Sequence, residues 1–319
     1  MTRFDGVTIA VVGGDAREQE IARQAVAAGA TVRCYGFPWP DGGIGGTALA
    51  PSPAAAMDGA DCALFPIPGI AADGTLFAPA APAPIVPDAA LLRRLAPGAV
   101  VILGEADSRL RAAAAAAGVT LSEYEHDTEL MLMRGPAIVE GVLALAIGNT
   151  AVTIHATPVG VIGFGNIGAL LARSLAALGA RVHVFARSPV QRAAAYAAAC
   201  EPHPLESLPA IAPGLQMLFS AVPAPVAGRA VLELLPPGSL VVDVAAPPGG
   251  VDLAAAAELG HRALWARGMG QRAPVTVGRS QWGGIAARLA AHRNPAGQRK
   301  PAGQAEPAGR AHERSDHAS

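Results

Sequence analysis

Aromatic side chains are scarce in this chain of 319 residues, since phenylalanine, tryptophan and tyrosine together make up 4% of it. Half of the residues are nevertheless hydrophobic (51%), and alanine dominates among them. The length is enough for two domains of ordinary size, each with a sizeable core. Such a core has to be built from small side chains, which let helices approach strands closely.

Cysteine is also scarce. Cys34, Cys62 and Cys200 are scattered, and the sequence has no C-x-x-C pair and no Cys/His spacing typical of a metal site. We therefore expect no metal site and no disulfide framework. The three thiols are interpreted as buried groups in the reducing cytoplasm.

Long apolar runs and basic runs are missing too. No stretch of eighteen apolar residues lacks a charge or a helix breaker, and the best candidate, AIVEGVLALAI, is short and contains Glu140. The first residues enter a strand pattern without the cleavage site of a signal peptide. The formal net charge is −1. The sequence therefore predicts a cytoplasmic protein that binds neither membranes nor nucleic acids.

Strand-like and helix-like segments alternate along the first half. Residues 7–12 predict a buried strand, and the helix after it, at 15–28, has Asp15 as its N-cap. Further strands are expected at 31–35, 62–65 and 100–103. This alternation predicts an α/β domain with a mostly parallel sheet. Residues 36–60 and the proline-rich stretch that follows the third strand are expected to be loops.

The same pattern restarts after residue 150, so we predict two Rossmann-like domains with doubly wound parallel sheets. Residues 1–134 form the N-terminal domain, which we assign to the substrate, and residues 151–279 form the nucleotide-binding domain. A buried connecting helix spans 135–150, with Pro136 in its first turn.

The C-terminal end has two parts. A helix at about 280–293 is expected, with packing back on the first domain left open. Residues 294–319 repeat Pro-Ala-Gly three times and carry nothing to bury. They are expected to be disordered.

The strongest motif is Gly163-Phe164-Gly165-Asn166-Ile167-Gly168, which has the spacing G-x-G-x-x-G between a predicted strand and an amphipathic helix. The first glycine makes the tight turn, the second lets the backbone approach a pyrophosphate, and the third lets the helix pack closely. The helix N-terminus favours the phosphates. The predicted cofactor-binding residues are Gly163, Gly165, Asn166, Ile167 and Gly168, with Val222 and Pro223 from the loop after a later strand.

The end of the next strand predicts which dinucleotide binds. An NAD site places an acidic residue there, but this sequence has Arg187 and Ser188, with Arg192 one turn further on. A guanidinium and a hydroxyl suit a 2′-phosphate, so we predict NADP as the cofactor. A solvated loop arginine is the alternative.

The turn after the first strand reads Gly13-Gly14-Asp15 and does not match the dinucleotide spacing. It still offers a helix N-terminus, with Arg17 in the first helical turn, and both suit a carboxylate. We predict that Gly13, Gly14, Asp15 and Arg17 contribute to substrate binding between the domains. A plain strand–helix turn is the alternative.

Catalytic candidates come from the acidic stretch SEYEHDTEL and from the connecting helix. His126 and Asp127 lie in the acidic stretch, where a histidine among carboxylates suits general acid–base catalysis. A solvated loop is the alternative reading. Glu140 lies in a nearly apolar helix, where a carboxylate needs a partner or faces the cleft.

With these segments placed, the chain resembles the A subunit of bacterial dipicolinate synthase. The matching signatures occur in order and are spread over nearly all of residues 7–285: VTIAVVGGDAR, YEHD, IVEGVLALAI, TIHATPVGVIGFGNIG, SAVP, LVVDVAAPPGGVD and APVTVG. The resemblance implies a bilobal oxidoreductase with the architecture of 2-hydroxyacid and alanine dehydrogenases. It also implies oxidation of dihydrodipicolinate, a dicarboxylate, to dipicolinate by NADP+, and a partner, the flavoprotein-like B subunit.

The sequence departs from that family in one segment expected near the substrate. Pro247 occupies the position where the family usually has a basic residue before Pro-Gly-Gly, and Arg134 or Arg272 is a candidate to compensate. Two other functions stay open: a bilobal NAD(P)-dependent oxidoreductase of another small carboxylate, and a non-catalytic nucleotide-sensing subunit. The oligomeric state is open as well, including a homo-oligomer.

Overall fold

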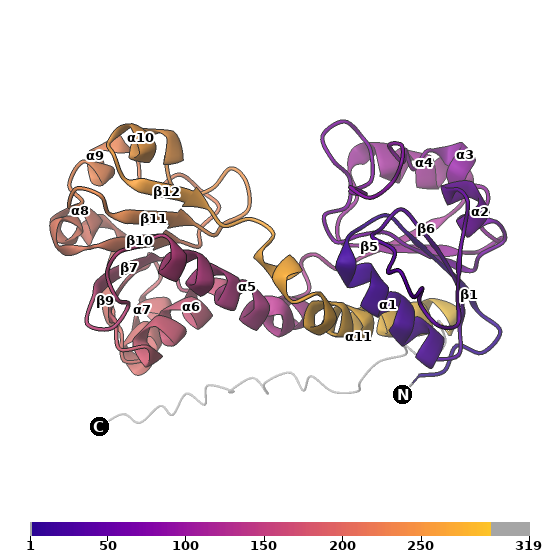
Figure 1. Ribbon diagram of the computed structural model, residues 1–319, viewed down its shortest axis with the longest axis horizontal. Coiled ribbons are helices and arrows are strands. Elements are labelled where there is room, and N and C mark those ends of the chain that lie inside the picture. Colours follow the sequence, from indigo (N-terminus) through magenta and orange to yellow (C-terminus); the bar gives the residue numbers. More distant parts are fainter. Residues whose placement is uncertain (1, 295–319) are drawn as a thin grey trace, which may run out of the picture.

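The computed structural model describes residues 2–294, and Figure 1 shows them as two lobes joined at a waist. The predicted tail therefore lies outside the described residues apart from Asn294. The first lobe contains these strands: β1 (Thr8–Val12), β2 (Thr31–Tyr35), β3 (Thr47–Leu49), β4 (Cys62–Leu64), β5 (Val100–Leu103) and β6 (Thr120–Glu123). Its helices are α1 (Ala16–Ala27), α2 (Pro53–Met57), α3 (Ala89–Leu92) and α4 (Ser108–Ala117).

The second lobe repeats this alternation. Its strands are β7 (Pro158–Ile162), β8 (Arg181–Phe185), β9 (Glu201–His203), β10 (Met217–Ser220), β11 (Leu240–Asp243) and β12 (Arg262–Trp265). Its helices are α6 (Asn166–Ala177), α7 (Pro189–Ala197), α8 (Leu208–Ile211), α9 (Arg229–Leu232) and α10 (Leu253–Glu258), with short 3-10 turns η1 (Leu205–Ser207), η2 (Ala212–Gly214) and η3 (Met269–Arg272).

The two sheets share one topology. The first has the order β3-β2-β1-β4-β5-β6, and the second, read in the same direction, has the order β9-β8-β7-β10-β11-β12. All strand pairs are parallel, with Val11 opposite Cys34 in the first sheet and Val161 opposite Val184 in the second. This is the doubly wound order, in which ligands bind outside the carboxyl ends of the central strands.

Each sheet is covered by helices on both faces, so its strands are apolar on both sides. Along β1, Ile9 and Val11 face one core, whereas Ala10 and Val12 face the other. The three cysteines are free and buried. Alanines of the helices, such as Ala22, Ala25 and Ala114, are buried in these cores.

Two long helices, α5 (Thr128–Gly148) and α11 (Pro274–Arg293), form the waist in Figure 1. From α5, Val139 and Val142 enter the core of the second lobe. Helix α11 returns to the first lobe, where Trp282 and Ile285 share a core with β1. The chain therefore crosses between the lobes twice, and the crossings lie beside the space between the domains.

Helix α5 differs from its predicted limits. It begins at Thr128, capped by Asp127, so Pro136 lies inside the helix and not in its first turn. Pro136 is exposed, as is Glu140. The N-cap at Asp127, within the acidic stretch, starts the helix earlier than the proline suggests.

Other predicted loops contain structure. Residues 36–60 include β3 and α2, and β6 occupies the start of the acidic stretch. The strands β3 and β6 are short and lie at the sheet edges. They contain too few buried residues to give the alternating pattern by which a strand is recognised in a sequence. The segment from Pro66 to Pro87 is mostly irregular, with one antiparallel bridge between Ile70 and Leu76.

By length and composition alone α5 could cross a membrane, with a mean hydropathy of 1.7 over its most apolar window. Its buried face nevertheless packs in the core of the second lobe through Val139, Val142 and Ala146. These contacts are those of a core helix between two domains.

The docking of α11 on the first lobe is expected to depend on Trp282, which is 4% exposed and makes an edge-to-face contact with Phe4 at 6.0 Å between ring centroids. Trp282→Ala should lower the free energy of unfolding of that lobe by about 3–5 kcal/mol, because it leaves a large cavity. Urea unfolding followed by circular dichroism measures the change. Tyr196→Ala, at a side chain that is 76% exposed, is the control and should change little.

Candidate functional site

The turn between β7 and α6 has the geometry of a pyrophosphate site. Gly163 has φ +91°, and a Cβ on Gly168 would lie 2.3 Å from the Gly163 carbonyl oxygen. A Cβ on Gly165 would meet nothing within 4 Å, so this residue faces open space. Gly165 is also the N-cap of α6, and no side chain in residues 2–294 caps that helix. The positive end of α6 is thus free to bind an anion.

A cavity of about 390 Å³ continues from this turn along the ends of β7, β8 and β10. Gly163, Gly165, Phe185 and Arg187 line it, together with residues 221–226 after β10. Val222 and Pro223, predicted from sequence, belong to that wall. The size of the cavity and the glycines that line it fit the adenosine and pyrophosphate parts of a dinucleotide.

The three polar residues predicted for a 2′-phosphate have different surroundings. Arg187 is exposed, lines the cavity, and makes no ion pair within residues 2–294. Ser188 caps α7, since its hydroxyl accepts from the Gln191 amide at 3.4 Å. The Arg192 guanidinium donates to the carbonyls of Ala186 (2.9 Å) and Arg187 (2.7 Å). Arg187 thus has a free cation for a ligand, and Arg192 holds the backbone beside it.

In the equivalent turn of the first lobe, between β1 and α1, backbone carbonyls and the Glu18 side chain already accept hydrogen bonds from the amides. The Gly13 and Gly14 amides donate to the carbonyls of Tyr35 and Phe77, at 2.8 and 2.7 Å. Asp15 and Glu18 form a capping box, in which the Glu18 carboxylate accepts from the Asp15 amide at 2.7 Å. A buried carboxylate therefore already satisfies the N-terminus of α1.

Glu18 is a residue that the sequence reasoning missed, although the D-x-x-E spacing of Asp15 and Glu18 indicates a capping box. It is 3% exposed, and burial raises its pKa to about 7 despite the opposing charge of Arg17. A Cβ on Gly14 would lie 2.2 Å from the Glu18 carboxyl carbon. Glycine at position 14 is therefore what makes room for this carboxylate.

A second cavity, of about 440 Å³, lies between the lobes. It is lined by Arg17 from α1, Glu125 before α5, Arg134 and Ile138 from α5, and by residues 244–247 and 266–271 of the second lobe. Ala221 and Pro223 line both cavities, so the two cavities adjoin. A dinucleotide in the first cavity would thus have its far end beside the second.

Two buried guanidinium groups, each paired with a carboxylate, line the interdomain cavity. Arg17 and Arg134 are 7% and 8% exposed. Arg17 makes two hydrogen bonds to the Asp15 carboxylate, both at 2.8 Å, and Arg134 makes two to Glu125, at 3.1 and 2.8 Å. Such paired donors have the fork geometry that recognises carboxylates. Gly13, Gly14 and Asp15 form the turn that positions Arg17.

The loop with the unusual proline also belongs to this cavity. Pro247 lines it, as do Arg134 and Arg267, whereas Arg272 pairs with Glu140 on α5. The loop is anchored by Asp243, which is 1% exposed and accepts from the amides of Ala245 (2.9 Å) and Gly250 (2.6 Å). Of the two arginines considered as replacements for the basic residue, Arg134 is thus the one at the cavity.

The structure gives His126, Asp127 and Glu140 other surroundings. The His126 side chain is 86% exposed and lies 3.7 Å from Glu105. Asp127 caps α5 and pairs with Arg288 at 3.1 Å, and this hydrogen bond lowers its pKa. The Glu140 side chain is 63% exposed beside Arg272. None of the three is among the residues that line the interdomain cavity in residues 2–294, so their catalytic roles stay predictions that this geometry does not favour.

The chain has two doubly wound domains, and the second has a glycine turn open to a pyrophosphate. A cavity lined by arginines lies between the domains. Together these features define a bilobal oxidoreductase that uses a nicotinamide nucleotide. Family models agree with this class. Residues 8–125 match the N-terminal domain of the dipicolinate synthase A subunit. Residues 158–247 match the family described as NADP oxidoreductase coenzyme F420-dependent.

The chain belongs to the family of the dipicolinate synthase A subunit. It is 30% identical over 275 residues to the A subunit of dipicolinate synthase from Bacillus subtilis (strain 168), covering 86% of this chain and 93% of that one. The crystal structure of the A subunit from Bacillus halodurans superimposes with a TM-score of 0.84 at 28% identity, covering 90% of this chain and 99% of the other.

A more distant match shows the fold alone. The transhydrogenase from Sinorhizobium meliloti has a TM-score of 0.60 at 15% identity, covering 88% of this chain and 93% of that one. The expected architecture and the resemblance to the dipicolinate synthase family are both confirmed.

Alanine substitutions at Gly165 and Gly168 are predicted to have opposite effects on nucleotide binding and stability. Gly165→Ala adds a methyl group to open space, so the melting temperature should stay unchanged while affinity for NADP(H) falls about tenfold or more, because the pyrophosphate loses its close approach. Gly168→Ala collides with the Gly163 carbonyl and should destabilise the domain by about 1–3 kcal/mol. Fluorescence titration and thermal unfolding separate the two effects, and equal nucleotide affinity in Gly165→Ala and wild type would contradict the assignment.

The buried Glu18 predicts a pH dependence of stability. Its pKa is about 7 in the folded chain against 4.5 as the reference value, so the folded chain holds a proton that the unfolded chain releases between these values. The stabilisation is complete below about pH 4.5 and is lost as pH rises through 7. Glu18→Gln should therefore gain about 1–3 kcal/mol relative to wild type between pH 5 and pH 8.

Urea unfolding at the two pH values measures this difference. Glu206→Gln, at an exposed position, is the control and should show no such gain. A difference between Glu18→Gln and wild type that is independent of pH would contradict the raised pKa.

Proposed function

We propose that this chain oxidises dihydrodipicolinate to dipicolinate with NADP+ as the hydride acceptor. The observation that carries the proposal is the pair of buried guanidinium groups, Arg17 and Arg134, in a cavity that shares wall residues with the nucleotide cavity. A dicarboxylate has two groups to match them. The name of the family, that of the dipicolinate synthase A subunit, agrees with a dicarboxylate product.

The residues of the second lobe fit NADP. The uncapped N-terminus of α6 and the open face of Gly165 suit the pyrophosphate, and the free guanidinium of Arg187 suits a 2′-phosphate. When bound, this cofactor supplies the hydride acceptor. The chain's own task is to bind the substrate beside it, in one orientation.

Orientation comes from the two arginines. Asp15 and Glu125 neutralise them in the described structure. We infer that the substrate carboxylates compete for these guanidinium groups, so that the ring is held between fixed charges. Ile138, Ile167 and Val277 provide an apolar wall that excludes water from the ring.

The reaction removes two electrons and a proton as a hydride and releases a second proton. Glu125 is the carboxylate that lines the cavity, and we assign it to accept that proton. It is released for this role when a substrate carboxylate takes its place on Arg134. The gain of aromaticity in the product drives the reaction.

Membership of an A-subunit family implies a partner, and we propose that it is the flavoprotein-like B subunit, meeting this chain in the cytoplasm. The test mixes the purified chain with NADP+ and freshly generated dihydrodipicolinate, with and without that partner. NADPH and dipicolinate should appear together in equal amounts. NADP+ binding with no product under either condition would remove this reaction and leave another small carboxylate or a nucleotide-sensing role.

The arginines predict a change in substrate affinity. Arg134→Met and Arg17→Met should each raise KM for dihydrodipicolinate about 10–100-fold, because a charged hydrogen bond contributes about 1.5–3 kcal/mol. Arg134→Lys keeps the charge without the paired geometry and should fall between. Arg111→Met removes an exposed arginine that pairs with Glu123 and is the matched control. Unchanged KM in both cavity variants would remove the dicarboxylate assignment.

The choice between NADP and NAD is predicted to depend on Arg187. Arg187→Ala should reduce the preference for NADP+ over NAD+ by one to two orders of magnitude, at about 1.5–3 kcal/mol for a charged hydrogen bond. Affinity for NAD+ should stay constant. Arg229→Ala, at an exposed ion pair in the same lobe, is the control. Calorimetric titration with both nucleotides gives the ratio, and an unchanged ratio would mean that Arg187 does not bind the 2′-phosphate.

A further inference from the structure

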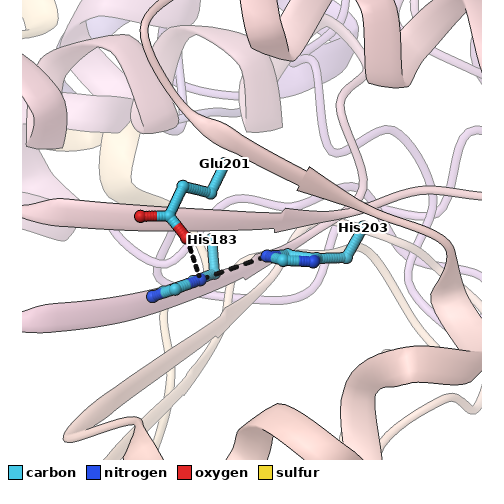
Figure 2. A group of neighbouring side chains, drawn as sticks. All are labelled: His183, Glu201 and His203. Atoms are coloured by element: carbon cyan, nitrogen blue, oxygen red, sulfur yellow. Dashed lines mark hydrogen bonds and ion pairs between the residues drawn. The ribbon is translucent and has the colours of Figure 1, made fainter.

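Two histidines and a glutamate converge on neighbouring strands of the second lobe, away from both turns described above. His183 lies in β8, and Glu201 and His203 lie in the edge strand β9, with His183 opposite Glu201 in the register. Because side chains alternate along a strand, Glu201 and His203 share a face. Figure 2 shows the three side chains pointing towards one another.

The distances suit a shared ion. Nδ1 of His183 lies 3.1 Å from Nε2 of His203 and 3.2 Å from a carboxylate oxygen of Glu201. The three ligand atoms all lie within 4.8 Å of one another. Around a tetrahedral zinc ion with bonds of about 2.0–2.1 Å, neighbouring ligand atoms are roughly 3.3 Å apart. The two separations from His183 match that spacing, and the remaining pair of atoms lies within 4.8 Å.

The ligands are held in place, yet an ion can reach them. The His203 ring stacks on Phe185 and on His183, with centroids 5.3 Å away in each case. The Glu201 side chain is 63% exposed, so solvent reaches the open side of the cluster.

We propose that His183, Glu201 and His203 bind one divalent transition-metal ion of the Zn²⁺ type, with a water molecule as the fourth ligand. Two imidazoles and one carboxylate are a donor set for such an ion, whereas Mg²⁺ prefers oxygen ligands alone. Sequence spacing did not reveal the site, because the ligands come from two strands and meet only through sheet pairing.

The ion would stabilise the pairing of the short edge strand β9 with β8 in the nucleotide-binding lobe. Strand β9 has three residues, and the His203 carbonyl accepts from the Ala186 amide at 3.1 Å. Ala186, Arg187 and Leu205 line the nucleotide cavity. A metal at this cluster would therefore stabilise the wall of that cavity without contacting the reacting groups.

The test measures Zn²⁺ binding to the full chain after treatment with a chelator, by competition with a chromophoric zinc indicator. Wild type should bind one more equivalent than His203→Ala, and Glu201→Gln should bind Zn²⁺ at that site at least about tenfold more weakly. His155→Ala, at an exposed histidine outside the cluster, is the matched control and should bind as wild type does. Mg²⁺ should not compete.

Thermal unfolding gives a second readout. Zn²⁺ should raise the melting temperature of wild type and of His155→Ala, and should raise it less in Glu201→Gln, whose exposed side chain can change without loss of the fold. Equal binding and equal thermal shifts in wild type, His203→Ala and Glu201→Gln would overturn the proposal.

Discussion

The structure depends on how each lobe satisfies the N-terminus of the helix that follows its first strand. Both lobes have the same strand order, so both place a helix N-terminus at the switch point of a parallel sheet. In the first lobe the buried Glu18 carboxylate accepts from the backbone there. In the second lobe no side chain in residues 2–294 caps α6, and Gly165 faces open space. One site is filled by a carboxyl group of the chain itself, and the other is free to bind a phosphate.

This asymmetry decides where the ligands can lie. A nucleotide on the second lobe extends towards the interdomain cavity, because Ala221 and Pro223 line both spaces. The capping box of the first lobe holds Asp15, which pairs with Arg17 at the edge of the same cavity. A turn that lacks the dinucleotide spacing thus positions a guanidinium at the interdomain cavity. Helices α5 and α11 connect the lobes beside this cavity and add Arg134 from α5.

Strands and helices whose buried residues recur at a regular spacing could be predicted from the sequence. Segments whose structure depends on tertiary contacts could not. The sequence of residues 163–168 predicts the turn between β7 and α6, because glycine is required at each of its three positions for a different steric reason. The start of α5 was misplaced because Asp127 caps the helix before Pro136. Glu140 was predicted to need a partner or to face the cleft, and it pairs with Arg272 on the exposed side of α5. Glu125 could be recognised as a cavity residue only when the lobes were placed together, and only then could Arg134 be preferred over Arg272 as the arginine at the cavity.

The most direct measurement of this account is the stoichiometry of NADPH binding by calorimetric titration of the full chain. The account predicts one NADPH per chain, because the Glu18 carboxylate occupies the anion position of the first lobe and the glycine turn of the second is open. Two NADPH molecules per chain would show that the first turn also binds nucleotide. No binding would show that the open turn of the second lobe is not a nucleotide site.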